Sequence, residues 1–183
     1  MSYLMKVVVG GKISKNILKH YFHLDSDSLL DARGFDFALR EIRVRDKSIK
    51  LQFWILNAPF LDSDRSSLYY GSIGLIIFFH KNDNRSLKKV SRWFNAFEKH
   101  SVRRPKSPPK ELFALVGIPN NHEMLPSEKG SSVAHKLGMV YYETSPKTTE
   151  TTRILTDLCT KMAEAYLTYV ETLQSKHGTP SLP

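Results

Sequence analysis

The sequence predicts one three-layer α/β domain, in which helices cover both faces of a mostly parallel six-stranded sheet that contains one antiparallel hairpin. Three observations support this prediction. The 183 residues are 41% hydrophobic and 25% charged, which is ordinary for a single compact domain. Apolar runs typical of strands alternate with segments of helical periodicity. Two of these runs are apolar throughout, as strands covered on both faces are.

The first half of the chain predicts a strand, a helix and a hairpin. Residues 5–9 form a short apolar run that ends in two glycines, and a helical stretch follows over 14–23. Apolar side chains then alternate with polar ones along 35–39 and 49–55. The polar segment 45–48 between these two runs indicates an antiparallel hairpin.

Two central strands and the helix between them are predicted next. The runs 73–79 and 112–116 are apolar throughout, so we expect them in the interior of the sheet. One amphipathic helix connects them, with Asn84 as its N-cap. Its apolar face consists of Leu87, Val90, Trp93, Phe94 and Phe97.

The remaining elements complete the domain. A helix after Pro126 to about Leu137, a strand around 139–142 and a last helix that carries apolar residues from Ile154 to Leu173 follow from the same periodicities. We expect residues 1–175 to form the domain and residues 176–183 to be a flexible tail.

A single cysteine and the absence of targeting segments indicate the cytoplasm. Cys159 has no disulfide partner within the chain and builds no thiolate metal site, which fits a reducing compartment. No apolar run reaches the length of a membrane span, and neither end carries a lipidation motif, so we expect neither a transmembrane segment nor a lipid anchor. The seven histidines are scattered, so we expect no metal site.

Positive charge gathers in one stretch of the sequence. The chain has 27 Lys and Arg against 18 Asp and Glu, a net charge of +9, and residues 81–110 alone hold 10 basic and 2 acidic residues. The candidate basic patch consists of Lys88, Lys89, Arg92, Arg103, Arg104 and Lys106. Three interpretations stay open, in this order: a solvated face, a surface for an acidic protein or an anionic membrane, and a nucleic-acid surface, which no accompanying motif supports.

Five short segments carry a family resemblance: 34–37, 50–54, 69–71, 115–117 and 143–147. In order and spacing they resemble the switch I motif, the interswitch strand, the end of switch II, the strand before the guanine-specificity motif, and the last nucleotide loop of the Rab branch of the Ras superfamily of small GTPases. The resemblance covers about residues 5 to 170. It implies the P-loop NTPase fold of these GTPases.

The phosphate loop that this resemblance implies is altered. Such a loop needs Gly-x-x-x-x-Gly-Lys-Ser/Thr, so that backbone amides wrap the phosphates and the hydroxyl binds Mg²⁺. The matching stretch, Gly10-Gly11-Lys12-Ile13-Ser14-Lys15-Asn16, is one residue short. Ser14 replaces the second glycine and Asn16 replaces the hydroxyl residue. Either Lys12 or Lys15 touches a phosphate, or the segment is a tight turn with solvated lysines.

The other motifs implied by the resemblance differ at the atoms that perform the chemistry. Ala32 stands at the magnesium-binding threonine, and residues 55–59 replace Asp-x-x-Gly-Gln, so we expect no GTP hydrolysis. Asn121 replaces the carboxylate that recognises guanine. Pro146, between Ser145 and Lys147, replaces the residue whose N–H binds the base, and proline has no N–H.

An aromatic triad is retained. Rab proteins contact their partners through three aromatic residues, which the resemblance places at Phe37, Trp54 and Tyr69. Trp54 is out of phase with the apolar residues Phe53 and Ile55, so we expect it to face away from that layer of packing. The alternative is that Phe37 and Trp54 are ordinary strand residues of the core.

The sequence therefore predicts a Rab-like pseudo-GTPase without a bound cofactor. We expect it to act as a protein-interaction subunit or adaptor in vesicle or ciliary transport, in the cytoplasm and peripheral to membranes through its partners. Two alternatives remain: a divergent GTP-binding switch that holds GTP or GDP with Mg²⁺ through Lys15, Asn121 and Lys147, and a basic module that binds nucleic acid or a membrane surface.

Overall fold

The computed structural model describes residues 2–24, 34–59, 64–101, 108–119 and 125–176. The strands are β1 (Ser2–Gly11), β2 (Phe35–Val44), β3 (Lys47–Leu56), β4 (Gly74–His80), β5 (Phe113–Ile118) and β6 (Val140–Glu143). The α-helices are α1 (Lys15–His20), α2 (Asn84–Lys88), α3 (Val90–His100), α4 (Ser127–Lys136) and α5 (Thr148–Lys176). Two short 3₁₀-helices are η2 (Asp64–Leu68) and η3 (Lys110–Leu112).

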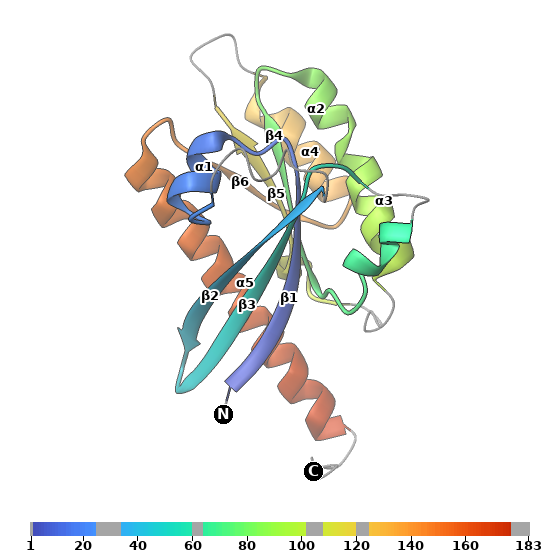
Figure 1. Cartoon of the computed structure of the whole chain (residues 1–183), viewed down its shortest axis with the longest axis vertical. Helices are drawn as coiled ribbons and strands as arrows, with labels where there is room; N and C mark the ends of the chain where they lie inside the picture. The colour runs from blue at the N-terminus through green and yellow to red at the C-terminus, as the bar shows by residue number, and fades with distance from the viewer. Residues whose placement is uncertain (1, 25–33, 60–63, 102–107, 120–124, 177–183) are drawn as a thin grey trace.

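The six strands form one sheet in the order β2-β3-β1-β4-β5-β6. Only β2 and β3 pair antiparallel, and every other neighbouring pair is parallel (Figure 1). This arrangement confirms the predicted fold class. The parallel strands bring their carboxyl ends to one edge of the sheet, where ligands of such folds bind.

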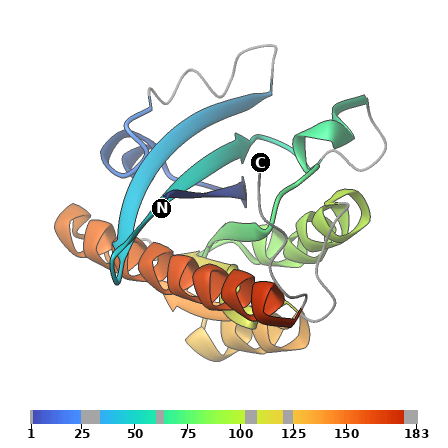
Figure 2. The ribbon, with the colours of Figure 1, turned by 90° about the horizontal axis from the view of Figure 1, so that it is seen from below.

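Helices cover the sheet on both faces, as Figures 1 and 2 show. On one face α1 contacts α5, and α5 lies along the sheet with Leu155, Leu158 and Met162 buried. On the other face α3 packs on β1 and β4, while α4 packs on β5 and β6. In the part of the chain that the structure describes, this second face is covered only in part, because no helix lies on the outer sides of β2 and β3.

Three local details differ from the sequence predictions. The first helix ends at His20 and not at residue 23, because the chain turns after Tyr21 and His23 adopts a positive φ of 57°. The predicted single helix is two helices, since Lys89 ends α2 and precedes α3. The N-cap of α2 is Asp83 and not Asn84: the Asp83 carboxylate accepts hydrogen bonds from the amides of Arg85 and Ser86.

Candidate functional site

The end of β1 continues as a strand where the resemblance predicts the start of a phosphate loop. Gly10 and Gly11 pair with Ile77 and Phe78 of β4, and the Lys12 amide donates a hydrogen bond of 2.8 Å to the Phe78 carbonyl oxygen. Gly11 has a φ of +85°, and a Cβ at this position would lie 2.0 Å from that same oxygen. The first amide after the two glycines is therefore already bonded to the sheet.

The turn into α1 completes this short connection. The Ser14 side chain caps α1 by accepting a hydrogen bond of 3.3 Å from the Ile17 amide. Helix α1 has only six residues, and Lys15 and Asn16 are exposed in its first turn. The Ser14 hydroxyl thus accepts the hydrogen bond of an amide that, at a free helix N-terminus, could bind an anion.

Lys12 forms an ion pair with Asp83, 71 residues further along the chain. The distance from Lys12 Nζ to the Asp83 carboxylate is 3.1 Å. The hydrogen bond from Lys12 lowers the pKa of Asp83, and hydrogen bonds from the amides of Ser86 and Arg85 lower it further. The cation that the sequence offers as a phosphate contact therefore has a carboxylate partner.

A cavity of about 220 Å³ lies beside this turn, where α1, the ends of β4 and β5 and the start of α5 meet. Its walls combine hydroxyl groups, imidazoles and apolar side chains. They include Asn16, His20, Tyr21, His80, Ser145 and Thr151. Burial lowers the pKa of His80, and the nearby positive charge of Lys12 lowers it further. Among the described residues, the lining of this cavity contains no lysine, arginine, aspartate or glutamate.

The loop between β6 and α5 uses its polar groups internally. The Ser145 amide donates to the Thr151 hydroxyl at 3.2 Å, and that hydroxyl donates to the Ser145 carbonyl oxygen at 2.7 Å. The Lys147 amide donates to the Ser145 hydroxyl, which in turn contacts the Glu150 carboxylate. The amides on either side of Pro146 are thus both occupied within the loop.

An aromatic cluster lies on the outer side of β2 and β3, where none of the described helices covers the sheet. Phe37 and Trp54 are directly opposite each other across the two strands, with ring centroids 5.4 Å apart, and Phe35 lies 5.6 Å from the same indole. Phe37 is 37% exposed, and Leu39, two residues along the same strand, is 63% exposed. Trp54 is half-buried, in agreement with the predicted strand phase.

Tyr69, which the resemblance places in the partner-binding triad, lies in the core. Its side chain is fully buried, with its ring 6.0 Å from that of His100 at the end of α3. Of the two neighbouring tyrosines, Tyr70 is the exposed one, at 52% exposure. The chain leaves η2 in a turn, and this turn directs the first tyrosine inward and the second outward.

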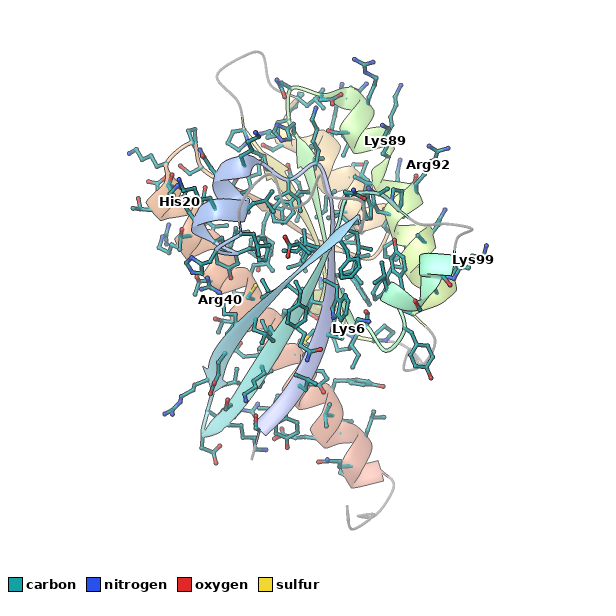
Figure 3. All side chains as sticks on the ribbon, in the orientation of Figure 1. Lys6, His20, Arg40, Lys89, Arg92 and Lys99 are labelled. Atoms are coloured by element: carbon teal, nitrogen blue, oxygen red, sulfur yellow. The ribbon has the colours of Figure 1, made fainter. Side chains whose placement is uncertain are left out.

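Lys6, which belongs to none of the sequence motifs, connects this turn to the aromatic cluster. Its ammonium lies 4.5 Å from the centre of the Trp54 ring and donates a hydrogen bond of 2.9 Å to the Tyr70 carbonyl oxygen. Burial lowers the pKa of Lys6. Figure 3 labels Lys6 beside the strands. Strand phase could have predicted this position of Lys6. In β1, Lys6 alternates with the buried Met5 and Val7, which places it on the outer face of the sheet.

The predicted basic residues fall into two groups. Lys88, Lys89 and Arg92 are exposed on α2, on α3 and at the junction between the two helices. Arg103, Arg104 and Lys106 lie outside the described residues, as do Asn121 and Ala32. The described residues hold no group of three or more His, Cys, Asp or Glu able to bind a metal ion. Within the same residues, no helix combines the length and apolar character that crossing a membrane requires.

The strand order and the two helical layers define a Ras-like small-GTPase fold, and comparison with known proteins gives the family. The model of the Ras family matches residues 7–164. The chain therefore belongs to the Ras family.

The relatives of this chain carry Rab-type names. It is 28% identical to the GTP-binding protein ypt2 of Schizosaccharomyces pombe, over 80% of this chain and 74% of that protein. It is 28% identical to the Ras-related protein SEC4 of Candida albicans, over 80% and 71%. It is 29% identical to the Ras-related protein RABD2b of Arabidopsis thaliana, over 79% and 73%.

Proposed function

We propose that this protein is a Rab-like pseudo-GTPase, a Ras-family fold that serves as a protein-interaction module without a bound nucleotide. Its Rab-type relatives suggest a place as a subunit or adaptor in intracellular transport, vesicular or ciliary. We expect it to be cytoplasmic, to reach membranes through its partners and to hydrolyse no GTP.

The course of β1 carries the proposal. A phosphate loop holds its ligand with consecutive backbone amides that point into an open ring, which requires the chain to leave the strand early. Here the strand stays paired through Gly11, and the Lys12 amide bonds to Phe78. Opening this segment around a phosphate would break the pairing of Gly11 and the hydrogen bond of Lys12.

The groups around the cavity support the same proposal. Lys12 is paired with Asp83, and the Ser145 and Lys147 amides are bonded within their own loop. A triphosphate brings several negative charges, and the cavity lining supplies no lysine or arginine to neutralise them. Mg²⁺ would need oxygen ligands in addition, and Asn16 offers an amide where the family has a hydroxyl.

We assign partner binding to Phe37 and Trp54 of the aromatic cluster together with the exposed Tyr70, whose turn Lys6 links to Trp54. Exposed aromatic rings that pack on one another are typical anchors of protein interfaces, because they bury a large area at a low cost in side-chain entropy. Lys6 holds the Tyr70 turn against this cluster without any nucleotide. The surface would then be permanently available to its partner and would not switch.

The experiment for the nucleotide proposal is a direct measurement of bound nucleotide. The purified protein is denatured, and the released material is separated by ion-exchange chromatography. We expect far less than one equivalent of GTP or GDP, and no binding of a fluorescent GTP analogue with Mg²⁺. The ypt2 protein of Schizosaccharomyces pombe, named as a GTP-binding protein, is the positive control. Stoichiometric nucleotide would contradict the proposal.

The alternative is a divergent GTP-binding switch, and the persistence of the cavity beside Asn16 and Ser145 favours it. If this alternative holds, the fluorescent analogue binds, and Lys15→Ala weakens that binding. Under our proposal, the wild type and Lys15→Ala are equally inactive in the same titration.

The interaction surface is tested separately, by partner capture from an extract of the source cells. We expect Phe37→Ala combined with Tyr70→Ala to abolish capture, whether GTP, GDP or neither is added. Leu173→Ala is the matched control, because Leu173 on α5 is 39% exposed, close to the value for Phe37. Undiminished capture by a folded double variant would rule out this surface.

A further inference from the structure

Helices α2 and α3 present a row of cations that the proposed function does not use. Arg85, Lys88, Lys89 and Arg92 are all exposed, and Lys88 and Lys89 each lie three or four residues from Arg85 and from Arg92. By contrast, Leu87, Val90 and Trp93 are buried in the core. We call these four residues the basic row. Figure 3 shows Lys89 and Arg92, with Lys99 further along α3, at the edge of the molecule and directed away from the sheet.

The basic row has no carboxylate partner within the described part of the chain. Cations on other elements do have one: Arg45 and Lys47 contact Glu171, Lys81 contacts Glu143, and Lys161 contacts Asp157. No acidic residue occurs between Asn84 and Phe97, and the nearby Asp83 is paired with Lys12. Within the described residues, no ion pair therefore neutralises the row, and the carboxylate that shares a hollow with it is Glu128 of α4.

The placement of these charges does not serve the fold. Arg85 and Lys89, like Lys88 and Arg92, are four residues apart around the junction of α2 and α3, where like charges repel one another. Lys89 and Arg92 also stand at the first turn of α3, where the helix dipole favours acidic residues, and the first turn of α3 contains none. A binding function explains a charge pattern that disfavours the isolated helices.

The hollowed shape of this surface favours a polypeptide over a lipid bilayer as its binding partner. A hollow of about 550 Å³ lies on one side of α2. Its charged lining residues are Arg85, Lys89 and the ion pair of Lys12 with Asp83. A second hollow, of about 430 Å³, lies between α2 and α4, and its charged lining residues are Lys88, Lys129 and Glu128. The exposed large apolar residues of the described chain, Leu4, Phe37, Leu39, Tyr70 and Leu173, are all on other elements, so nothing on α2 or α3 would insert into lipid.

We propose that the basic row is a docking site for an acidic segment of a partner protein, in which aspartate or glutamate side chains enter the two hollows beside α2. The complementary charges would neutralise the row and remove its internal repulsion. This site is independent of nucleotide and would be a second contact in addition to the aromatic cluster.

The test uses the full chain and a labelled synthetic peptide of alternating glutamate and glycine. The row variant carries Lys88→Gln, Lys89→Gln and Arg92→Gln. The matched control carries Arg43→Gln, Lys136→Gln and Arg153→Gln, three exposed cations on β2, α4 and α5. Both variants lose the same charge. We expect the row variant to bind the peptide about tenfold more weakly, the sum of three exposed charge pairs, and the control to change less than about twofold.

Three outcomes would overturn the proposal. Equal weakening in both variants would mean that only the overall charge attracts the peptide. Binding to vesicles of phosphatidylcholine and phosphatidylserine without binding to the peptide would make the row a membrane surface. A clear fall in the thermal midpoint of the row variant would mean that these cations hold the fold, whereas release of their repulsion predicts an unchanged or higher midpoint.

Discussion

The indole ring of Trp93 lies directly against the backbone of Gly10, at the point where β1 reaches the candidate site. A Cβ on Gly10 would stand 2.3 Å from two carbon atoms of that ring. Trp93 is buried in α3, so the ring has little room to withdraw. The glycine that the family uses to start a phosphate loop here makes room for a core side chain.

Gly10→Ala should therefore destabilise the protein through a steric clash. We expect a loss of about 2 kcal/mol in the free energy of unfolding, the usual cost of overpacking a dense core. Urea denaturation of the wild type and the variant measures it. In the background of Trp93→Leu, where the ring is absent, the same substitution should cost much less.

Gly71→Ala is the control for this experiment. Gly71 has a φ of +73°, and its added Cβ would meet no atom within 4 Å. Its cost, about 1 kcal/mol, arises from backbone conformation alone and should be the same in the Trp93→Leu background. Equal rescue of both alanine variants by Trp93→Leu would contradict the proposed contact.

Elements whose residues alternate or repeat regularly could be predicted from the sequence. The strand phase of Trp54 predicted its place on the outer face, and the phase of Lys6 carried the same information. Tyr69 could not be placed in this way, because it lies in a turn after η2, where no fixed period assigns a side chain to a face.

Long-range contacts were the part that the sequence did not reveal. The altered Gly10–Asn16 segment predicted a changed loop, but not that β1 stays paired through Gly11. Nothing local indicates that Lys12 contacts Asp83, which is 71 residues away. Asp83 and Asn84 are equally good capping residues by type, so the choice between them depends on where the chain leaves β4.

Lys6→Met should loosen the turn at Tyr70 while leaving the strand intact. The substitution keeps the apolar stem but removes the hydrogen bond to the Tyr70 carbonyl oxygen and the charge over Trp54. We expect a loss of about 1 kcal/mol in stability. Hydrogen exchange should become faster at the amides of Tyr69, Tyr70 and Ser72, which bond within this turn.

Lys50→Met is the comparison for Lys6. Lys50 is exposed in β3 on the same outer face of the sheet. Its replacement should leave exchange in the turn unchanged. If the amides of the turn exchange at the same rate in both variants, Lys6 does not hold the turn.

Lys81→Met should destabilise the protein by leaving a carboxylate without its partner. Lys81 Nζ is buried, 2.9 Å from Glu143 and 3.1 Å from the Ser127 hydroxyl. Burial raises the pKa of Glu143, but hydrogen bonds from Ser127, Tyr141 and Lys81 outweigh it, and the net shift is downward. Breaking one side of a buried pair costs 3–5 kcal/mol; Glu143 is partly exposed, so we expect about 2 kcal/mol.

The pH dependence distinguishes this effect from a packing defect. Because the pKa of Glu143 is lowered on folding, its contribution is complete above about pH 4.5 and is lost as the pH falls through the folded value. In Lys81→Met this carboxyl loses that stabilisation. The difference in unfolding free energy between wild type and variant should therefore shrink below pH 4.5, and a constant difference would mean that Lys81 acts through packing.

His80 should make the protein less stable in mild acid. Burial, with the charge of Lys12, holds the pKa of His80 below its ordinary value of 6.5. Between the lowered pKa of the folded state and the ordinary value of 6.5, His80 therefore binds a proton more readily in the unfolded chain than in the folded one. The contribution of neutral His80 is complete above pH 6.5 and is lost as the pH falls toward the folded value.

His80→Gln removes this titration, so its stability should fall less than that of the wild type between about pH 7.5 and about pH 5. Urea midpoints at the two pH values measure the difference. Lys12→Gln should reduce the wild-type slope in part, because it removes one cause of the lowered pKa and leaves burial in place. A slope that is the same in wild type and His80→Gln would show that other groups account for the acid sensitivity.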